Sequence, residues 1–184
     1  ADGSTTRELH SNLIRTWELF MWDSGGWDDY PAQIATLNRG IHARTTCAAI
    51  TAHVILSARI LLAAAQALGL DDDVRLYNDD IALLTDALQT HAWDESAGVF
   101  SYVVHDENGN PAASLRHDSG VNFNLGLDGL MPLIAGVCTP AQESHFWALL
   151  QDSTRYWTRI GISTVDQSAP YYRTDGYWNG AVWM

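Results

Sequence analysis

Apolar residues recur at helical spacing in three stretches of the first half of the chain. The first predicts a helix over about residues 6–22. The second, over about 45–68, is apolar on nearly every face, so we expect it to be packed on all sides and to end at Gly69. The third, over about 71–90, has a narrower apolar stripe and should lie outside the second helix with one face in water.

The second half mixes short strands with short helices. Residues 99–104 and 112–115 alternate in strand fashion around a polar turn and predict a β-hairpin. A short helix is expected over 125–134, and another over about 139–152 begins with a capping-box signature. The last stretch, 156–184, reads mostly as loop. Because no linker or repeat divides residues 1–184, we expect one all-α unit with a small β-hairpin.

Composition narrows the classes of partner. The chain is 47% hydrophobic and 17% charged, which is typical of a globular protein, and its net charge is −12 with no lysine. This charge would repel nucleic acids and anionic membranes, so neither is expected as a partner. The apolar run at 48–70 is interrupted by polar residues and predicts a buried helix, not a membrane span. An acidic, lysine-free surface fits secretion as well as the cytosol.

The common catalytic and metal-binding motifs do not occur. There is no HExxH, no GxSxG and no glycine-rich phosphate loop. Cys47 and Cys138 lack metal-site spacing, and the stretch 106–117 begins like a calcium loop but has Pro111 where the loop needs glycine. We therefore expect no metal and no cofactor.

Carboxylates that stand beside aromatic residues are the candidate functional groups of this sequence. Asp28 and Asp29 stand between Trp27 and Tyr30 in a segment, 27–31, that is predicted as loop because a residue before proline avoids the helical region. Aromatic rings pack on the flat faces of sugars, and burial among rings raises the pKa of a carboxyl, which suits a general acid. The competing interpretation is a plain loop with tryptophans in the core. The residues expected to bind a sugar are Trp22, Trp27, Asp29, Tyr30, Tyr177, Trp178, Asn179, Gly180 and Trp183.

Four segments, in order along the chain, resemble motifs of glycoside hydrolase family sixty-three, which holds processing α-glucosidases and mannosylglycerate hydrolases and is related to the trehalases. Residues 24–31 resemble its "SGxDDYP" motif and residues 93–100 its "WDxxxGxF" hairpin. Residues 129–136 are similar to "GLxPLxxG", and 161–183 to "GxxS…YWRGPVW". One such match is weak, but four in order are fairly specific.

This resemblance implies an (α/α)6 barrel, in which six helix hairpins surround an acidic cup. It also implies hydrolysis of an α-glycosidic bond with inversion, in an oligosaccharide or a small glycoside. Asp28 corresponds to the general acid of the family, and a second carboxylate about 6.5–9.5 Å away would activate water. The sequence departs from the family at Ala32, Asn179 and Ala181, where relatives carry arginine, arginine and proline, so only the reaction class is carried over.

The catalytic base of the family is a glutamate well downstream of the Tyr-Trp motif. None of the five glutamates of this chain stands there. We therefore expect part of the toroid only, with the base beyond Met184 and no activity of this chain alone. Two rival functions stay open: a non-catalytic carbohydrate-binding or scaffold protein with the same aromatic cleft, and an epimerase or lyase, which would need a histidine pair in the cup.

Overall fold

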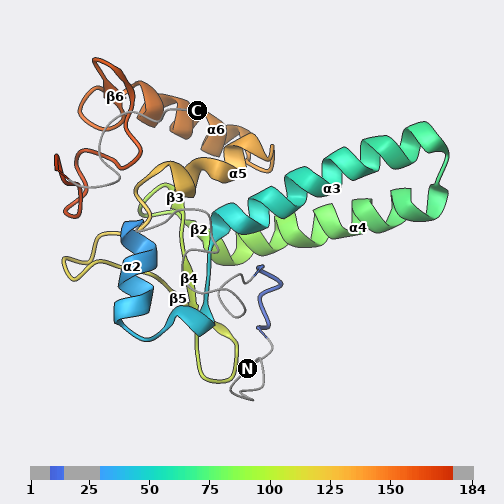
Figure 1. The fold of residues 1–184 in the computed structure, drawn as a ribbon, viewed down its shortest axis with the longest axis horizontal. Helices are drawn as coiled ribbons and strands as arrows, with labels where there is room; N and C mark the ends of the chain where they lie inside the picture. Colours follow the sequence, from blue (N-terminus) through green and yellow to red (C-terminus); the bar gives the residue numbers. More distant parts are fainter. Residues whose placement is uncertain (1–8, 15–29, 176–184) are drawn as a thin grey trace.

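The computed structural model describes residues 9–14 and 30–175, and in this part the fold is helix-rich (Figure 1). Its helices are α2 (Pro31–Asn38), α3 (Ala48–Leu68), α4 (Asp71–Ala87), α5 (Met131–Ile134) and α6 (Pro140–Gln151). Short 3-10 turns span His42–Arg44 and Leu127–Leu130, and a π-helical turn, Leu88–Ala92, continues α4.

Short antiparallel strands lie between the helices. Strands β1 (Thr45–Thr46), β4 (Val103–His105) and β5 (Pro111–Ser114) form one sheet in the order β1-β4-β5. Two smaller ladders pair β2 (Trp93–Asp94) with β3 (Val99–Phe100) and β6 (Trp157–Thr158) with β7 (Gly161–Ile162). The predicted hairpin is confirmed as β4–β5, but Val99 and Phe100 belong to a separate ladder and residues 45–46 add a third strand.

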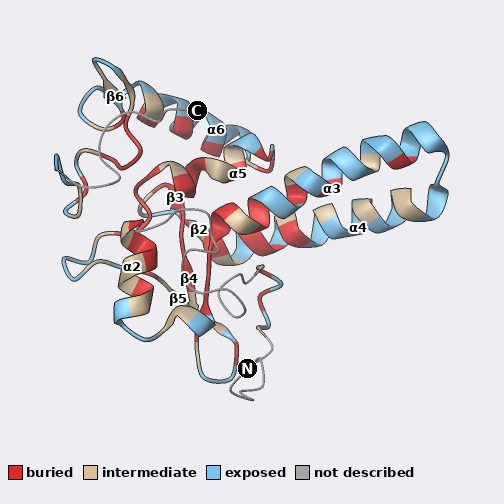
Figure 2. Cartoon of the chain, in the orientation of Figure 1, coloured by how far each residue is buried: buried red, intermediate tan, exposed pale blue. Residues whose placement is uncertain are grey.

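Helices α3 and α4 pack side by side as a long antiparallel hairpin that extends away from the rest of the described chain (Figure 1). The helix predicted over 45–68 is confirmed from Ala48 onward, and Gly69 ends it in the left-handed conformation with φ +69°. The expected packing on all sides is wrong. Ile55 is fully buried, whereas Ile60 is 65% exposed and Leu68 72% exposed. Figure 2 shows α3 mostly buried near its start and mostly exposed toward its far end.

The prediction that α3 is packed on all sides came from its apolar composition, which does not indicate which neighbouring elements are present. A helix buries only the surface that other elements reach, and in the described chain α4 covers one side of the distal half. Within the described residues α3 is also the one helix long and apolar enough to cross a membrane by length and composition. Its first turns lie in the core, and along its length it packs against α4.

The helix predicted over 6–22 is wrong where it can be compared. Residues 9–14 form turns and irregular chain, and Asn12 has a positive φ of 60°. Two side-chain hydroxyls take the backbone donors that a helix would use: Leu13 N–H donates to Ser11 Oγ and Ile14 N–H to Thr51 Oγ1. The rest of that predicted helix lies outside the described residues.

The loop predicted over 27–31 also needs correction, because Pro31 is the first residue of α2. Proline is favoured at that position, since its missing N–H would be unpaired there anyway. The buried side chains of α2 are Ala32, Gln33 and Thr36, and this set carries no apolar repeat that would have predicted the helix. Residues 27–29 are outside the described part.

The two later helices are confirmed with shorter bounds. The 125–134 prediction resolves into the 3-10 turn Leu127–Leu130 followed by α5. Helix α6 begins with the predicted capping box, in which Gln142 N–H donates to Thr139 Oγ1 at 3.3 Å and Thr139 N–H donates to Gln142 Oε1 at 2.9 Å. The described part of the predicted C-terminal loop holds the short β6–β7 ladder, turns and an isolated bridge from Val165 to Gly126.

The core lies where α2, the start of α3, the strands and α6 meet. Its aromatic part includes Phe100 and Phe146, both fully buried, with Trp93 edge-on to each at ring centroid distances of 5.1 and 5.8 Å. Three tyrosines, Tyr30, Tyr102 and Tyr156, are also fully buried. Large buried rings supply most of the apolar area in such a core.

Candidate active site

Most of the predicted site residues lie outside the described chain. These are the predicted acid Asp28 together with Trp22, Trp27, Asp29, Tyr177, Trp178, Asn179, Gly180 and Trp183. Tyr30 is described, and it has no exposed surface. Its ring therefore packs in the core and offers no face to a sugar in this structure. The described residues of the segments 24–31 and 161–183, Tyr30 and Tyr171 among them, locate the candidate site.

Tyr30 packs against the segment 122–130. Its hydroxyl oxygen stands 1.9 Å from where a Cβ on Gly126 would lie, so only glycine leaves room for it. The segment is held from several sides. Leu127 N–H donates to Thr164 O at 2.9 Å, and the Asn124 amide donates to Phe100 O at 2.8 Å.

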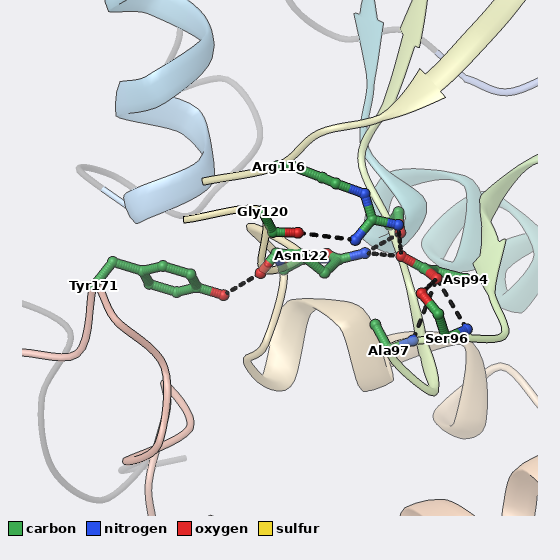
Figure 3. A network of polar contacts seen from close by, with 9 residues as sticks. Asp94, Ser96, Ala97, Arg116, Gly120, Asn122 and Tyr171 are labelled. Carbon is green, nitrogen blue, oxygen red and sulfur yellow. Dashed lines mark hydrogen bonds and ion pairs between the residues drawn. The ribbon is translucent and has the colours of Figure 1, made fainter. Parts of the chain in front are cut away.

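Tyr171 packs against the same segment from the other end of the chain. Its hydroxyl accepts a hydrogen bond from Leu125 N–H at 2.7 Å and donates one to Asn122 O at 2.9 Å (Figure 3). Its ring stacks on Phe123 with centroids 4.7 Å apart and an interplanar angle of 17°. Burial raises the pKa of Tyr171 well above its usual value, so the hydroxyl stays protonated and can serve both bonds.

A network of charged and polar side chains surrounds Asp94 and includes Asn122 of the 122–130 segment (Figure 3). Asp94, at the end of β2, is buried, and its carboxylate accepts from Arg116 at 2.7 Å and from the Asn122 amide at 2.8 Å. Ser96 also donates to it, through both its N–H and its hydroxyl. Burial raises the pKa of Asp94, but these donors and the Arg116 charge outweigh burial, and the pKa is lowered. This carboxylate is therefore ionised and fully engaged in structure.

A second buried acid, Asp128, sits within the segment itself. It has no exposed surface, and the Cys47 thiol donates to its two oxygens at 3.4 and 3.6 Å. Burial raises its pKa to about 6, against the opposing effect of the Tyr102 hydroxyl and the Cys47 thiol. Sequence reasoning missed Asp128. The available signal was a carboxyl inside the apolar run 127–134, although helix expectations hid it.

The family model for the "Mannosylglycerate hydrolase MGH1-like glycoside hydrolase domain" matches residues 15–184. No curated protein sequence matches the chain. Among solved structures, a sialidase is similar with a TM-score of 0.60 and 16% identity, over 76% of this chain and 12% of that one.

Two further solved structures come from Thermus thermophilus. A GH63 mannosylglycerate hydrolase in complex with glucose has a TM-score of 0.56 and 20% identity over 82% of this chain and 37% of its own. An uncharacterized conserved protein has a TM-score of 0.56 and 21% identity over 79% of this chain and 34% of its own. At these identities the likeness concerns the fold, and the chain spans at most 37% of the length of these three structures.

Proposed function

Since the chain belongs to the family of mannosylglycerate hydrolase MGH1-like glycoside hydrolase domains, we propose that it carries the acid half of an inverting glycosidase site. Asp28 protonates the glycosidic oxygen of an α-linked glucoside or a related sugar. A glutamate beyond Met184 activates water on the opposite face of the sugar ring, about 6.5–9.5 Å from Asp28. The chain is then inactive alone.

One observation supports this proposal: Tyr30 and Tyr171, from the first and the last of the four family-like segments, both contact residues 122–130. Tyr30 packs on Gly126, and Tyr171 is hydrogen-bonded to the adjacent residue, Leu125.

Tyr30 and Tyr171 are far apart in sequence, and both contact the 122–130 segment. A general acid and the rings that hold its substrate must converge on one sugar, and this shared contact supports such a convergence. In this account Trp27, Trp178 and Trp183 bind the sugar, whereas the buried Tyr30 holds the acid segment in place instead of contacting the ligand.

The proposal extends to the architecture. The antiparallel hairpin of α3 and α4 is the kind of unit from which an (α/α)6 barrel is built, and the helix-rich described part fits a portion of that barrel. The apolar residues left exposed on the distal half of the hairpin are consistent with further hairpins packing there in a complete toroid.

The test uses a longer protein that contains this chain together with the base glutamate proposed above. Hydrolysis of phenyl α-D-glucopyranoside is followed by the absorbance of the phenol released, and the anomer released first is read by proton NMR. We expect the β-anomer, because inversion of an α-linkage gives β. Asp28→Asn should reduce turnover about 10²–10⁴-fold, the usual contribution of a general acid. Glucose binding, measured by tryptophan fluorescence, should change little.

Asp29→Asn is the matched control, since it changes the neighbouring carboxyl in the same way. Its loss of turnover should be smaller than that of Asp28→Asn. Full turnover in Asp28→Asn would remove Asp28 from the acid role. A wild-type protein that binds glucose and hydrolyses no glycoside would instead indicate a carbohydrate-binding protein.

A further inference from the structure

We propose that Asp128 is a positioning residue for this site, because its buried carboxyl joins the 122–130 segment to the start of α3 and so fixes the surface on which Tyr30 and Tyr171 rest. The inference rests on the proposed function and deepens it. It adds a residue that none of the motifs singled out.

The contacts of Asp128 come from separate parts of the chain. Cys47 is the residue immediately before α3, and its thiol donates to both carboxyl oxygens. Tyr102 lies between β3 and β4, and its buried hydroxyl faces the same carboxyl and acts on its pKa. All three side chains are buried. Asp128 therefore ties its own segment to α3 and to the strands.

Tyr30, the residue that follows Asp28 and Asp29 in the sequence, packs beside the cluster of Asp128, Cys47 and Tyr102. The Tyr30 hydroxyl packs at Gly126, two residues before Asp128. The Asp128 charge also acts on that hydroxyl: after burial, it is the largest cause that raises the pKa of Tyr30. A change in the position or charge of Asp128 is thus transmitted to the residue that follows the Asp28-Asp29 pair.

A buried carboxyl used only for a structural contact has a cost in folding free energy, because its charged form is removed from water. The groups that face it are the hydroxyls of Tyr102 and Tyr30 and the Cys47 thiol, and burial dominates its pKa shift. Removing a charge from water without a cation is unfavourable, and an asparagine of the same shape would avoid that cost. Such a local conflict is expected at a functional position.

The proton on Asp128 then matters for the site. With a pKa of about 6, the carboxyl is neutral in more acidic solution and charged in more alkaline solution. Ionisation places an uncompensated charge under Tyr30 and favours water entry and loosening of the 122–130 segment. The site should therefore hold sugar best below about pH 6, and an asparagine at position 128 should preserve that state at higher pH.

The experiment compares the wild-type longer protein with Asp128→Asn and Asp128→Ala between about pH 4.5 and 8.5. Glucose affinity and acrylamide quenching of tryptophan fluorescence are both measured. Wild-type affinity should fall about tenfold as pH rises through 6, the factor equivalent to one pKa unit of coupling. Over the same range its tryptophans should become easier to quench.

Asp128→Asn should keep both properties constant over this range, while Asp128→Ala should bind weakly at every pH. Asp106→Asn is the control, since it alters an exposed carboxyl in the β4–β5 turn; its profiles should follow the wild type. Identical pH profiles in wild type and Asp128→Asn would overturn the proposal.

The two proposals fail separately. If the wild type binds no glucose at any pH, the glycosidase proposal loses its support, and the quenching profiles still decide the role of Asp128. A quenching transition near pH 6 that disappears in Asp128→Asn supports the tie between Asp128 and the acid segment. A transition that persists in Asp128→Asn contradicts it.

Discussion

The Tyr30 hydroxyl occupies the space where a side chain on Gly126 would begin, 1.9 Å from the ideal Cβ position. Gly126→Ala must therefore displace a fully buried ring. We expect the variant to lose about 1–3 kcal/mol of unfolding free energy in urea, as for overpacked cores.

Tyr30→Phe provides the control for this pair. Without the hydroxyl, the nearest atoms to the new Cβ are Thr164 O at 3.0 Å and Tyr30 Cζ at 3.1 Å, and the worst overlap is gone. Gly126→Ala should thus cost less in the Tyr30→Phe background than in the wild type. Additive losses would mean that the two residues do not share this space.

Tyr171→Phe should destabilise the 122–130 segment. The substitution removes the acceptor of the buried Leu125 N–H and the donor to Asn122 O. An unpaired buried N–H costs about 1–3 kcal/mol, which denaturant unfolding would detect. Tyr172→Phe, at the neighbouring position, is the comparison, and equal losses in the two variants would contradict the assigned role of the Tyr171 hydroxyl.

The lowered pKa of Asp94 predicts how the stability of the protein responds to acid. Because its folded-state pKa is lowered, it contributes stability above its ordinary pKa of 3.8, and this stability is lost as pH falls through the folded value. Arg116→Met should weaken the effect by about 1 kcal/mol or less, since 41% of the Arg116 side chain is exposed. Thermal unfolding between about pH 2 and 5 measures both proteins. An unchanged acid limb in Arg116→Met would show that the hydrogen bonds from Ser96, Ala97 and Asn122 lower the pKa without a contribution from Arg116.

Two isoleucines on α3 test the burial pattern of the hairpin. Ile55 is fully buried and Ile60 is 65% exposed. Ile55→Ala should cost about 2–5 kcal/mol in unfolding free energy. Ile60→Ala should stay within about 0.5 kcal/mol in this chain. A large loss for Ile60→Ala would mean that its side chain is covered in solution.

Local signals in the sequence predicted local structure well. Gly69 ends α3 because glycine adopts the left-handed conformation easily, and the Thr139–Gln142 capping box is a bond pattern within four residues. Burial of α3 was mispredicted, because apolar composition does not say which neighbours are present. Helix α2 was missed since its buried residues are alanine and small or polar side chains.

The candidate site, like the fold, could be predicted from local signals but not from contacts between distant segments. Motif spacing drew attention to the segments around Tyr30 and Tyr171 and to residues 129–136, but it did not predict that Tyr30 and Tyr171 both contact residues 122–130. That contact depends on residues more than 40 positions apart, as in the Tyr171–Leu125 bond, which joins positions separated by 46. The cluster of Asp128, Cys47 and Tyr102 likewise exists only after three separate elements have packed.

The most direct measurement of the central claim is the dependence of Asp28→Asn turnover on the leaving group, in the longer protein that contains this chain. Phenyl α-D-glucopyranoside needs protonation of its leaving oxygen, whereas α-D-glucosyl fluoride needs little help from an acid. If Asp28 is the proton donor, the variant should lose about 10²–10⁴-fold on the phenyl glucoside and far less on the fluoride. Equal losses on the two substrates would contradict the role of Asp28 as the general acid.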